Sequence, residues 1–180
     1  MKCKNWTLIE TLVKLENKWI TLIGERVENA SGRLLDFWRV ERSDSIIIIP
    51  IHETQLILPV PQYRHGIGKT TLDFPGGRYE GKDDLKDAAK SILKRELHLD
   101  AVDTVKLNPI NEEGWIVDSS FSNQRIFSFE ARFTSEVKLN PSLVYMRKQA
   151  NNSGAKEILE VLSCLQCRCV LLEWMQGNLG

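Results

Sequence analysis

A run of glycines and carboxylates in the middle of the chain has the residue types needed to hold an ion. Residues 72–99 read LDFPGGRYEGKDDLKDAAKSILKRELHL. Gly76 and Gly77 free the backbone at a turn, where side chains would otherwise clash. Hard divalent cations prefer oxygen ligands. The carboxylates of this run that could supply them include Glu80, Asp83 and Glu96. We therefore expect a device for binding an anion or a metal ion.

The second half of this run has the pattern of an amphipathic helix. Asp83 or Asp84 can cap its first turn, because an aspartate side chain accepts hydrogen bonds from free N–H groups. Apolar residues then recur at spacings of three and four, as on a helix with one face against a core. They are Leu85, Ala88, Ala89, Ile92 and Leu93. This pattern places Glu96 on a helix that follows the glycine turn.

With these residues in view, the segment resembles a Nudix box. The family pattern is Gly, five residues, Glu, seven residues, Arg-Glu-apolar, one residue, Glu-Glu, one residue, Gly-apolar. Counted without a gap from Gly77, Asp83 falls on the first Glu and Glu96 on the last. The apolar positions are filled by Leu93 and Leu99.

Two runs upstream of the box extend the resemblance. PQYR at residues 61–64 and LDFPGG at residues 72–77 are similar to runs in the ADP-ribose pyrophosphatase-like subgroup of the Nudix superfamily. The resemblance implies an α/β (α+β) fold, a Nudix-type α/β/α sandwich with a mixed sheet and an N-terminal antiparallel β arm. It also implies a nucleoside diphosphate ligand, and a homodimer formed through the arm.

The chain departs from the box at four positions. Ser91 replaces the Arg, Ile92 and Arg95 replace two Glu residues, and His98 replaces the Gly. In the family, the Glu residues at the positions of Ile92 and Glu96 share the divalent metal ions that bridge the pyrophosphate. The resemblance therefore implies a weakened metal site, with Glu96 and Gly76 as its candidate ligands. Mg²⁺ or Mn²⁺ is expected if the protein is active, and no cofactor if it is not.

Coordination chemistry leads to the same expectation. Carboxylates four residues apart on one helix face present two oxygen ligands to one ion. Here the residue one turn before Glu96 is the hydrocarbon Ile92, and Arg95 adds a positive charge beside the site. Loss of the electrostatic contribution of a metal ion costs roughly three or more powers of ten in rate.

A second register fits part of the segment. With a four-residue insertion, Arg95-Glu96-Leu97 matches the Arg-Glu-apolar run, and Asp100 follows Glu96 by four residues. The insertion is about one helical turn, so the helix face would be kept. We favour the ungapped register because it accounts for the apolar positions without an insertion.

Other side chains could complete a site. If the chain is a hydrolase, Glu80, Asp83 and Glu113 join Glu96 as candidate catalytic residues, with Glu112 and Asp118 nearby in sequence. The candidate ligand-binding residues are Arg64, Gly76, Gly77, Arg78, Trp19 and Trp38. Arginine binds phosphate and an exposed indole stacks on a base, although each tryptophan could instead fill a core or a dimer interface.

Composition narrows the class of protein. The 180 residues are 42% hydrophobic and 27% charged, as in a soluble globular protein. Lys and Arg total 24 and so do Asp and Glu, which argues against a protein that binds nucleic acid by neutralising phosphates. No apolar run approaches the ~20 residues of a membrane span, and the N-terminus lacks the apolar core of a signal peptide. We expect a cytoplasmic, single-domain protein, with an arm over residues 1–43 and a core over residues 44–180.

The remaining elements follow from local patterns. Residues 18–28 and 34–41 predict a hairpin, and the four isoleucines of residues 46–49 predict a central strand buried on both faces. Residues 135–153 are expected to form an irregular surface loop. A helix is expected over residues 155–176, with a break near Cys167.

The cysteines leave two interpretations open. Cys164, Cys167 and Cys169 crowd into CLQCRC, whose spacing suggests zinc, while Cys3 stands apart. A structural zinc ion usually has four N or S ligands, and no histidine or fourth cysteine lies nearby. Apolar neighbours favour buried free thiols.

Three classes of function are compatible with these features. The first is a regulatory protein that binds an ADP-ribose-like ligand or another nucleoside diphosphate without efficient turnover, and the sequence favours it. The second is an active, metal-dependent hydrolase of such a compound. The third is a structural module that recognises a protein partner.

Overall fold

The computed structural model describes residues 6–99 and 102–178, so that Cys3 and Asp100 lie outside the described residues. The chain divides into two compact units. The first comprises Met1–Ser43 and Ile116–Arg125, and the second comprises Asp44–Trp115 and Ile126–Gly180. The single-domain organisation and the arm boundary inferred from the sequence stay predictions. Each unit is described by itself below.

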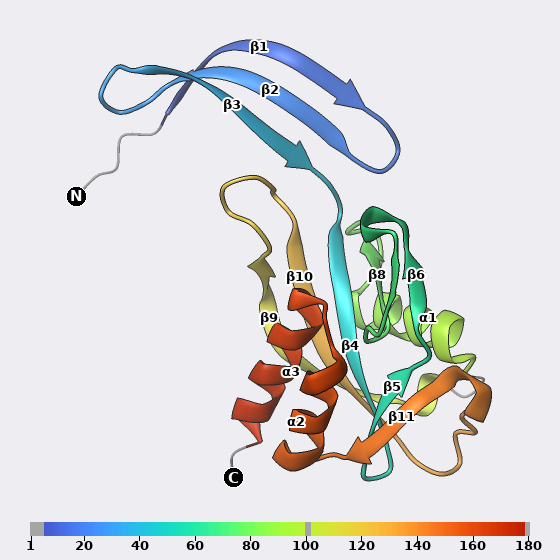
Figure 1. The fold of residues 1–180 in the computed structure, drawn as a ribbon. Coiled ribbons are helices and arrows are strands. Elements are labelled where there is room, and N and C mark those ends of the chain that lie inside the picture. The colour runs from blue at the N-terminus through green and yellow to red at the C-terminus, as the bar shows by residue number, and fades with distance from the viewer. Residues whose placement is uncertain (1–5, 100–101, 179–180) are drawn as a thin grey trace. The chain divides into compact units, whose positions relative to one another are not determined.

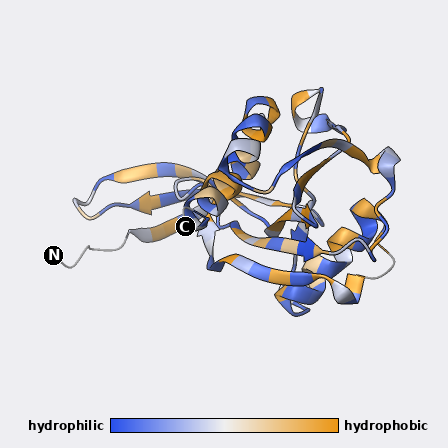
Figure 2. Cartoon of the chain, turned by 90° about the horizontal axis from the view of Figure 1, so that it is seen from below, coloured by the Kyte–Doolittle hydropathy of each residue, from blue (hydrophilic) through white to orange (hydrophobic). Residues whose placement is uncertain are grey.

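The first unit contains a three-stranded antiparallel sheet in the order β1-β2-β3 (Figure 1). The strands are β1 (Thr7–Glu16), β2 (Thr21–Glu28) and β3 (Leu34–Glu41). The pair β2–β3 is the predicted hairpin, and Gly32 adopts a left-handed conformation (φ 80°) in its turn. Large hydrophobic side chains are exposed on these strands. Figure 2 shows the hydrophobic residues of the strands in orange.

The second unit contains a mixed sheet in the order β11-β5-β4-β10-β9, with β8 also paired to β4. Its strands are β4 (Asp44–His52), β5 (Gln55–Pro59), β8 (Gly76–Tyr79), β9 (Lys106–Ile116), β10 (Arg125–Phe133) and β11 (Val144–Gln149). The β4–β10 pair is parallel, whereas β4 pairs with β5 and β8 in antiparallel fashion. A short ribbon of β6 (Gln62–Arg64) and β7 (Lys69–Thr71) precedes β8.

The predicted central strand is confirmed in β4. Ile46, Ile48 and Ile49 are fully buried and Ile47 is nearly so. Successive side chains of a strand point to opposite faces, so a run of four apolar residues requires cover on both. Ile46 and Ile48 belong to the main core cluster, which includes residues of α1 (Leu85–Leu97).

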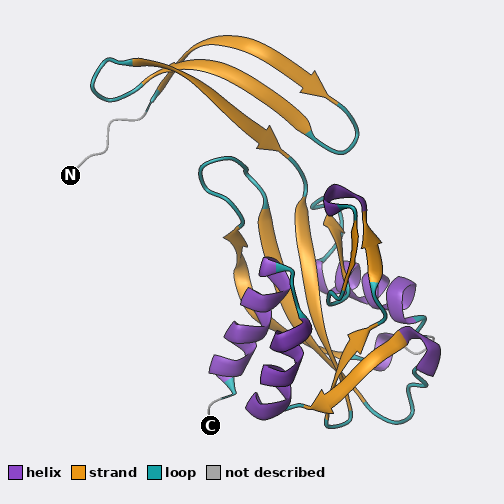
Figure 3. Ribbon diagram, in the orientation of Figure 1, coloured by secondary structure: helices purple, strands orange, loops and turns teal. Residues whose placement is uncertain are grey.

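Helices cover the sheet of the second unit as Figures 1 and 3 show. They are α1, α2 (Asn152–Val161) and α3 (Leu165–Gly177), with short 3₁₀ turns at His65–Ile67, Val102–Thr104 and Pro141–Leu143. The expected α/β class with a mixed sheet and an antiparallel β arm is thus confirmed. Among the described residues, no helix has both the length and the apolar character that a membrane span requires.

Two local expectations differ from the structure. Residues 135–153 are not an irregular loop, because Val144–Gln149 form β11, which pairs with β5 and alternates between half-buried and exposed residues. The C-terminal helix is broken at residues 162–164, a few residues before the expected place, since Cys164 begins a new helix as its N-cap.

Candidate functional site

A cavity of about 600 Å³ lies beside the glycine turn in the second unit. Its walls come from the start of β4, from residues 64–78 and from the beginning of α3. Volumes of this size are typical of small-molecule sites. Arg64, Asp73, Arg78 and Cys164 contribute polar side chains to it, and Gly76 and Gly77 contribute main-chain groups. Four of the six predicted ligand-binding residues, namely Arg64, Gly76, Gly77 and Arg78, therefore line one cavity.

Arg64 is fixed at this cavity by Asp73. Its Nε and Nη2 atoms lie 2.7 Å and 2.6 Å from Oδ2 of Asp73, and Thr71 donates from Oγ1 to the same oxygen at 2.9 Å. The ion pair holds the long arginine side chain in one place, which reduces the entropy lost when it binds a ligand. Together with Arg78, it supplies two guanidinium groups at one cavity, and guanidinium groups recognise phosphate.

The box helix α1 begins and ends as local capping chemistry requires. Asp84 is its N-cap, and its side chain accepts from the N–H of Lys86 at 2.8 Å. The helix ends at Leu97, and His98 follows in a left-handed conformation (φ 52°, ψ 41°). The inserted register would have carried the helix a turn further, so its end at Leu97 favours the ungapped register.

Glu96 faces the glycine turn, and the positively charged guanidinium of Arg95 lies beside its carboxylate. Arg95 donates from Nη2 to Oε1 of Glu96 at 2.9 Å and to the carbonyl oxygen of Gly76 at 3.2 Å. The Gly76 N–H in turn donates to Oε2 of Glu96 at 3.3 Å. The two groups named as candidate metal ligands are thus bridged by one guanidinium.

These residues do not fit a divalent metal ion of the Mg²⁺ type. The position one turn before Glu96 is Ile92, which is only 3% exposed and packs in the core. A Cβ atom placed on Gly77 would lie 3.0 Å from Cγ1 of Ile92 and 3.0 Å from Nη2 of Arg95, so the space is filled. One carboxylate beside a fixed positive charge is a poor donor set for a cation that requires several oxygen ligands.

Neither Glu96 nor the other predicted catalytic carboxylates are among the residues that line the cavity. Glu80 is exposed and pairs with Lys82 at 2.7 Å, and this hydrogen bond lowers the pKa of Glu80. The main-chain oxygen of Asp83 accepts from the Tyr79 hydroxyl. Glu113 is exposed on β9. The structure therefore does not place these three carboxylates in the cavity that Arg64 and Arg78 line.

The predicted stacking residues Trp19 and Trp38 belong to the first unit. Lys18 places its Nζ atom 4.5 Å from the centroid of the Trp19 ring. The indole of Trp38 lies over Gly24 on the neighbouring strand, where an added Cβ would approach Cη2 to 2.9 Å. Each indole thus has a local packing partner while staying about half exposed.

Sequence reasoning missed one cluster. Asp73, Cys164 and Cys167 each bring a potential ligand atom to within 4.8 Å of the others. A hydrogen bond from Cys167 lowers the pKa of the Cys164 thiol to about 6, with help from the N–H groups at the start of α3, while burial opposes the shift. The hydrogen bond to Cys164 and the burial of the side chain both raise the pKa of the Cys167 thiol. The two-residue spacing of the cysteines was visible in the sequence, but the third member is distant in it.

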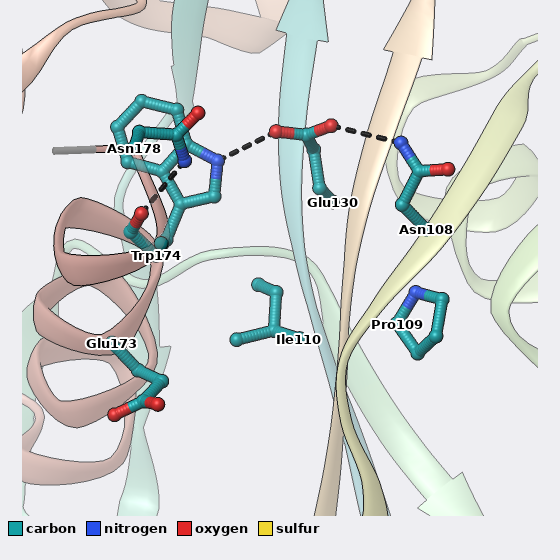
Figure 4. Close-up of a pocket in the computed structure, with 8 residues that line it drawn as sticks. Asn108, Pro109, Ile110, Glu130, Glu173, Trp174 and Asn178 are labelled. Atoms are coloured by element: carbon teal, nitrogen blue, oxygen red, sulfur yellow. Dashed lines mark hydrogen bonds between the residues drawn. The ribbon is translucent and has the colours of Figure 1, made fainter. Parts of the chain in front are cut away.

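A smaller cavity of about 300 Å³ lies at the other end of α3 (Figure 4). Its buried carboxylate, Glu130, accepts from Asn108 Nδ2 at 3.0 Å and from Trp174 Nε1 at 2.6 Å. Arg132 adds two further hydrogen bonds, from Nε and Nη2. The bond from Trp174 ties α3 to β10 and the bond from Asn108 ties β9 to β10, so we interpret this network as structural.

Comparison with known proteins yields a likeness in three-dimensional structure. No family model and no curated protein sequence matches the chain. In contrast, 156 chains of solved structures match its fold. One of them, described as the crystal structure of an ADP compounds hydrolase, superposes with a TM-score of 0.76 at 16% identity, over 98% of this chain and 97% of that chain. At such low identity the likeness concerns the fold, and the fold of this chain is of the Nudix type.

Proposed function

We propose that this chain binds a nucleoside diphosphate derivative, such as ADP-ribose, and hydrolyses it slowly or not at all. The main support is the position of Arg95, whose guanidinium bridges the Gly76 carbonyl and the Glu96 carboxylate. A guanidinium has one positive charge and no vacant coordination position. It can hold the turn and the helix together, but it cannot activate a water molecule as a bound metal ion does.

Ligand binding is supported by the cavity beside this bridge. Arg64 and Arg78 can neutralise the charge of a diphosphate, and Gly76 and Gly77 allow a ligand close to the main chain. The solved structure of similar fold is named for ADP compounds, which is consistent with this class of ligand. In this proposal the protein acts as a cytoplasmic sensor or regulatory partner, and the bound ligand is its signal.

Calorimetry with ADP-ribose tests the proposal, once with EDTA and once with Mg²⁺ or Mn²⁺, while phosphate-containing products are followed in parallel. We expect the same affinity under both conditions and negligible product. Arg64→Ala should weaken binding roughly tenfold or more, because a charge-assisted hydrogen bond contributes about 1.5–3 kcal/mol. Failure to bind ADP-ribose, nucleotide sugars or diadenosine polyphosphates would reject the proposal.

An active hydrolase is the second candidate, and the retained Glu96 favours it. In that case Arg95 would have to leave the Gly76 carbonyl, and Mg²⁺ or Mn²⁺ would bind there with Glu96. Metal-dependent release of product that Glu96→Gln abolishes would establish this alternative in place of the binding protein.

We further propose that the N-terminal sheet mediates a homodimer. Its exposed side chains include Leu8, Leu15, Leu34 and Trp38, and clusters of this kind mark protein–protein contacts. Sedimentation should show a dimer that Leu15→Lys dissociates. Tyr145→Lys, at an equally exposed residue of β11, is the control and should stay dimeric. A monomeric wild-type chain at micromolar concentration would contradict this proposal.

A further inference from the structure

We propose that Asp73, Cys164 and Cys167 form a binding site for one thiophilic divalent cation, Zn²⁺ or a metal of similar chemistry. Their ligand atoms all lie within 4.8 Å of one another. In a tetrahedral zinc site the Zn–S bonds are about 2.3 Å, so two ligand sulfurs lie roughly 3.8 Å apart. The three side chains need to move by only about 1 Å to reach this geometry.

The carboxylate of Asp73 is already prepared for a ligand on one side. Its side chain is 10% exposed, and Oδ2 accepts from Arg64 and Thr71. Oδ1 is buried and has no hydrogen-bond partner among the described residues. An unpaired buried oxygen is costly, and binding a cation removes that cost. Arg64 and Thr71 then act as the outer partners that orient a metal-ligating carboxylate.

The two thiols are placed by the start of α3. Cys164 is the N-cap residue and Cys167 lies one turn along, so the helix itself fixes their separation. C-x₂-C is the usual spacing of paired zinc ligands. Cys169, two residues later, is exposed and is not part of the cluster.

The charges of the site balance when a metal ion is bound. Both cysteines bind the ion as thiolates, so that the two thiolates and the carboxylate together carry three negative charges. The divalent cation and the Arg64 guanidinium offset these with three positive charges. The metal ion would therefore lie in a neutral, partly buried cluster, which keeps the electrostatic cost of burying the charges low.

Three protein ligands leave the fourth position of a tetrahedral ion open. All three line the same cavity as Arg78 and Gly76, so this position faces the cavity. Zinc ions with three protein ligands and one exchangeable position bind water or a substrate atom. The metal site adds a Lewis acid to the cavity that is separate from the Glu96 position, and it does not depend on the function proposed above.

Cobalt titration of the reduced protein tests this site directly. The chain has four cysteines, and the variant Cys3→Ser/Cys169→Ser leaves only Cys164 and Cys167. With Co²⁺ this variant should develop a thiolate-to-cobalt charge-transfer band and the visible bands of tetrahedral Co²⁺. Both should saturate at one ion per chain, and Zn²⁺ should then displace the cobalt.

Further substitutions in the same background identify the ligands. Cys164→Ser should remove about half of the charge-transfer band, and Asp73→Asn should weaken cobalt affinity at least about tenfold. Circular dichroism checks that each variant is folded, which matters most for the buried Cys167. The inference is overturned if the background variant binds no Co²⁺. Unchanged binding in folded Cys164→Ser and Asp73→Asn variants overturns it equally.

Discussion

Arg95 donates a hydrogen bond from Nη2 to Oε1 of Glu96, its neighbour in sequence, at 2.9 Å. The same Nη2 atom lies 3.2 Å from the carbonyl oxygen of Gly76. Adjacent residues of a helix point in different directions, so this contact needs the long arginine side chain to fold back toward β8. The result is a positive charge of the protein in the position where the box resemblance implies a metal ion.

The first prediction concerns Glu96. Since Glu96 does not line the cavity and is paired with Arg95, Glu96→Gln should change the affinity for ADP-ribose by less than about threefold, or ~0.7 kcal/mol. Calorimetry with and without Mg²⁺ measures this. A large loss of affinity that occurs only with Mg²⁺ present would mean that Glu96 holds a metal ion beside the ligand.

Restoring the family residue at position 92 should damage the fold. Ile92→Glu places a carboxylate in a packed core, against Gly77, and we expect a loss of about 3 kcal/mol or more in the free energy of unfolding. Urea denaturation measures it. The control Ser91→Arg changes an exposed neighbour and should stay within about 0.5 kcal/mol of wild type. Equal stabilities of the two variants would contradict the packing described.

Replacing His98 with the glycine of the family pattern should raise the stability of the protein. It is exposed and adopts φ 52°, a conformation that costs a residue with a Cβ about 1 kcal/mol more than glycine. His98→Gly should therefore stabilise the protein by about that amount, which thermal unfolding can detect. Lys94→Gly, inside the same helix, should instead destabilise it by about 1 kcal/mol. A loss of stability in His98→Gly would show that its side chain has a role in packing.

The two aspartates before α1 should differ in their effects. Asp84→Ala removes the side chain that accepts from Lys86 N–H and should cost about 1 kcal/mol. Asp83→Ala removes an exposed side chain from the preceding loop and should cost much less. Chemical denaturation of both variants checks the assignment of the cap, and the reverse order would transfer the cap to Asp83.

Glu130 should make the protein sensitive to acid. Burial raises the pKa of this carboxyl, but the hydrogen bonds from Arg132, Trp174 and Asn108 together outweigh it, so the pKa in the folded state lies below the ordinary value of 4.5. The unfolded chain then binds the proton more tightly than the folded one. The stabilisation is present above pH 4.5 and is lost as the pH falls through the lower folded-state pKa.

Unfolding free energies measured between neutral and acidic pH check this. Glu130→Gln should be less stable at pH 7 and should show a smaller further loss toward acid than the wild type. Glu112→Gln, at an exposed residue of β9, is the control. If the wild type and Glu130→Gln lose the same unfolding free energy between neutral and acidic pH, other groups cause the sensitivity to acid.

Much of the fold can be predicted from the sequence, because the relevant signals are local. Four consecutive isoleucines predict β4, since a strand buried on both faces needs no polar alternation. Apolar spacing predicted α1, and turn residues predicted the β2–β3 hairpin. The strand β11 was missed because its half-buried, half-exposed pattern acquires meaning only when β5 provides a partner.

The contacts within the candidate site could not be predicted without the tertiary structure. The spacing of the box identified Glu96 and the replacement of its partner by Ile92, but not the bridge from Arg95 to Gly76. That bridge depends on where β8 lies against α1. Likewise Cys164 and Cys167 are a local pair, whereas Asp73 joins them from a distant part of the chain. Spacing along a helix or strand is set by backbone geometry and is readable from the sequence, while contacts between elements depend on how those elements pack.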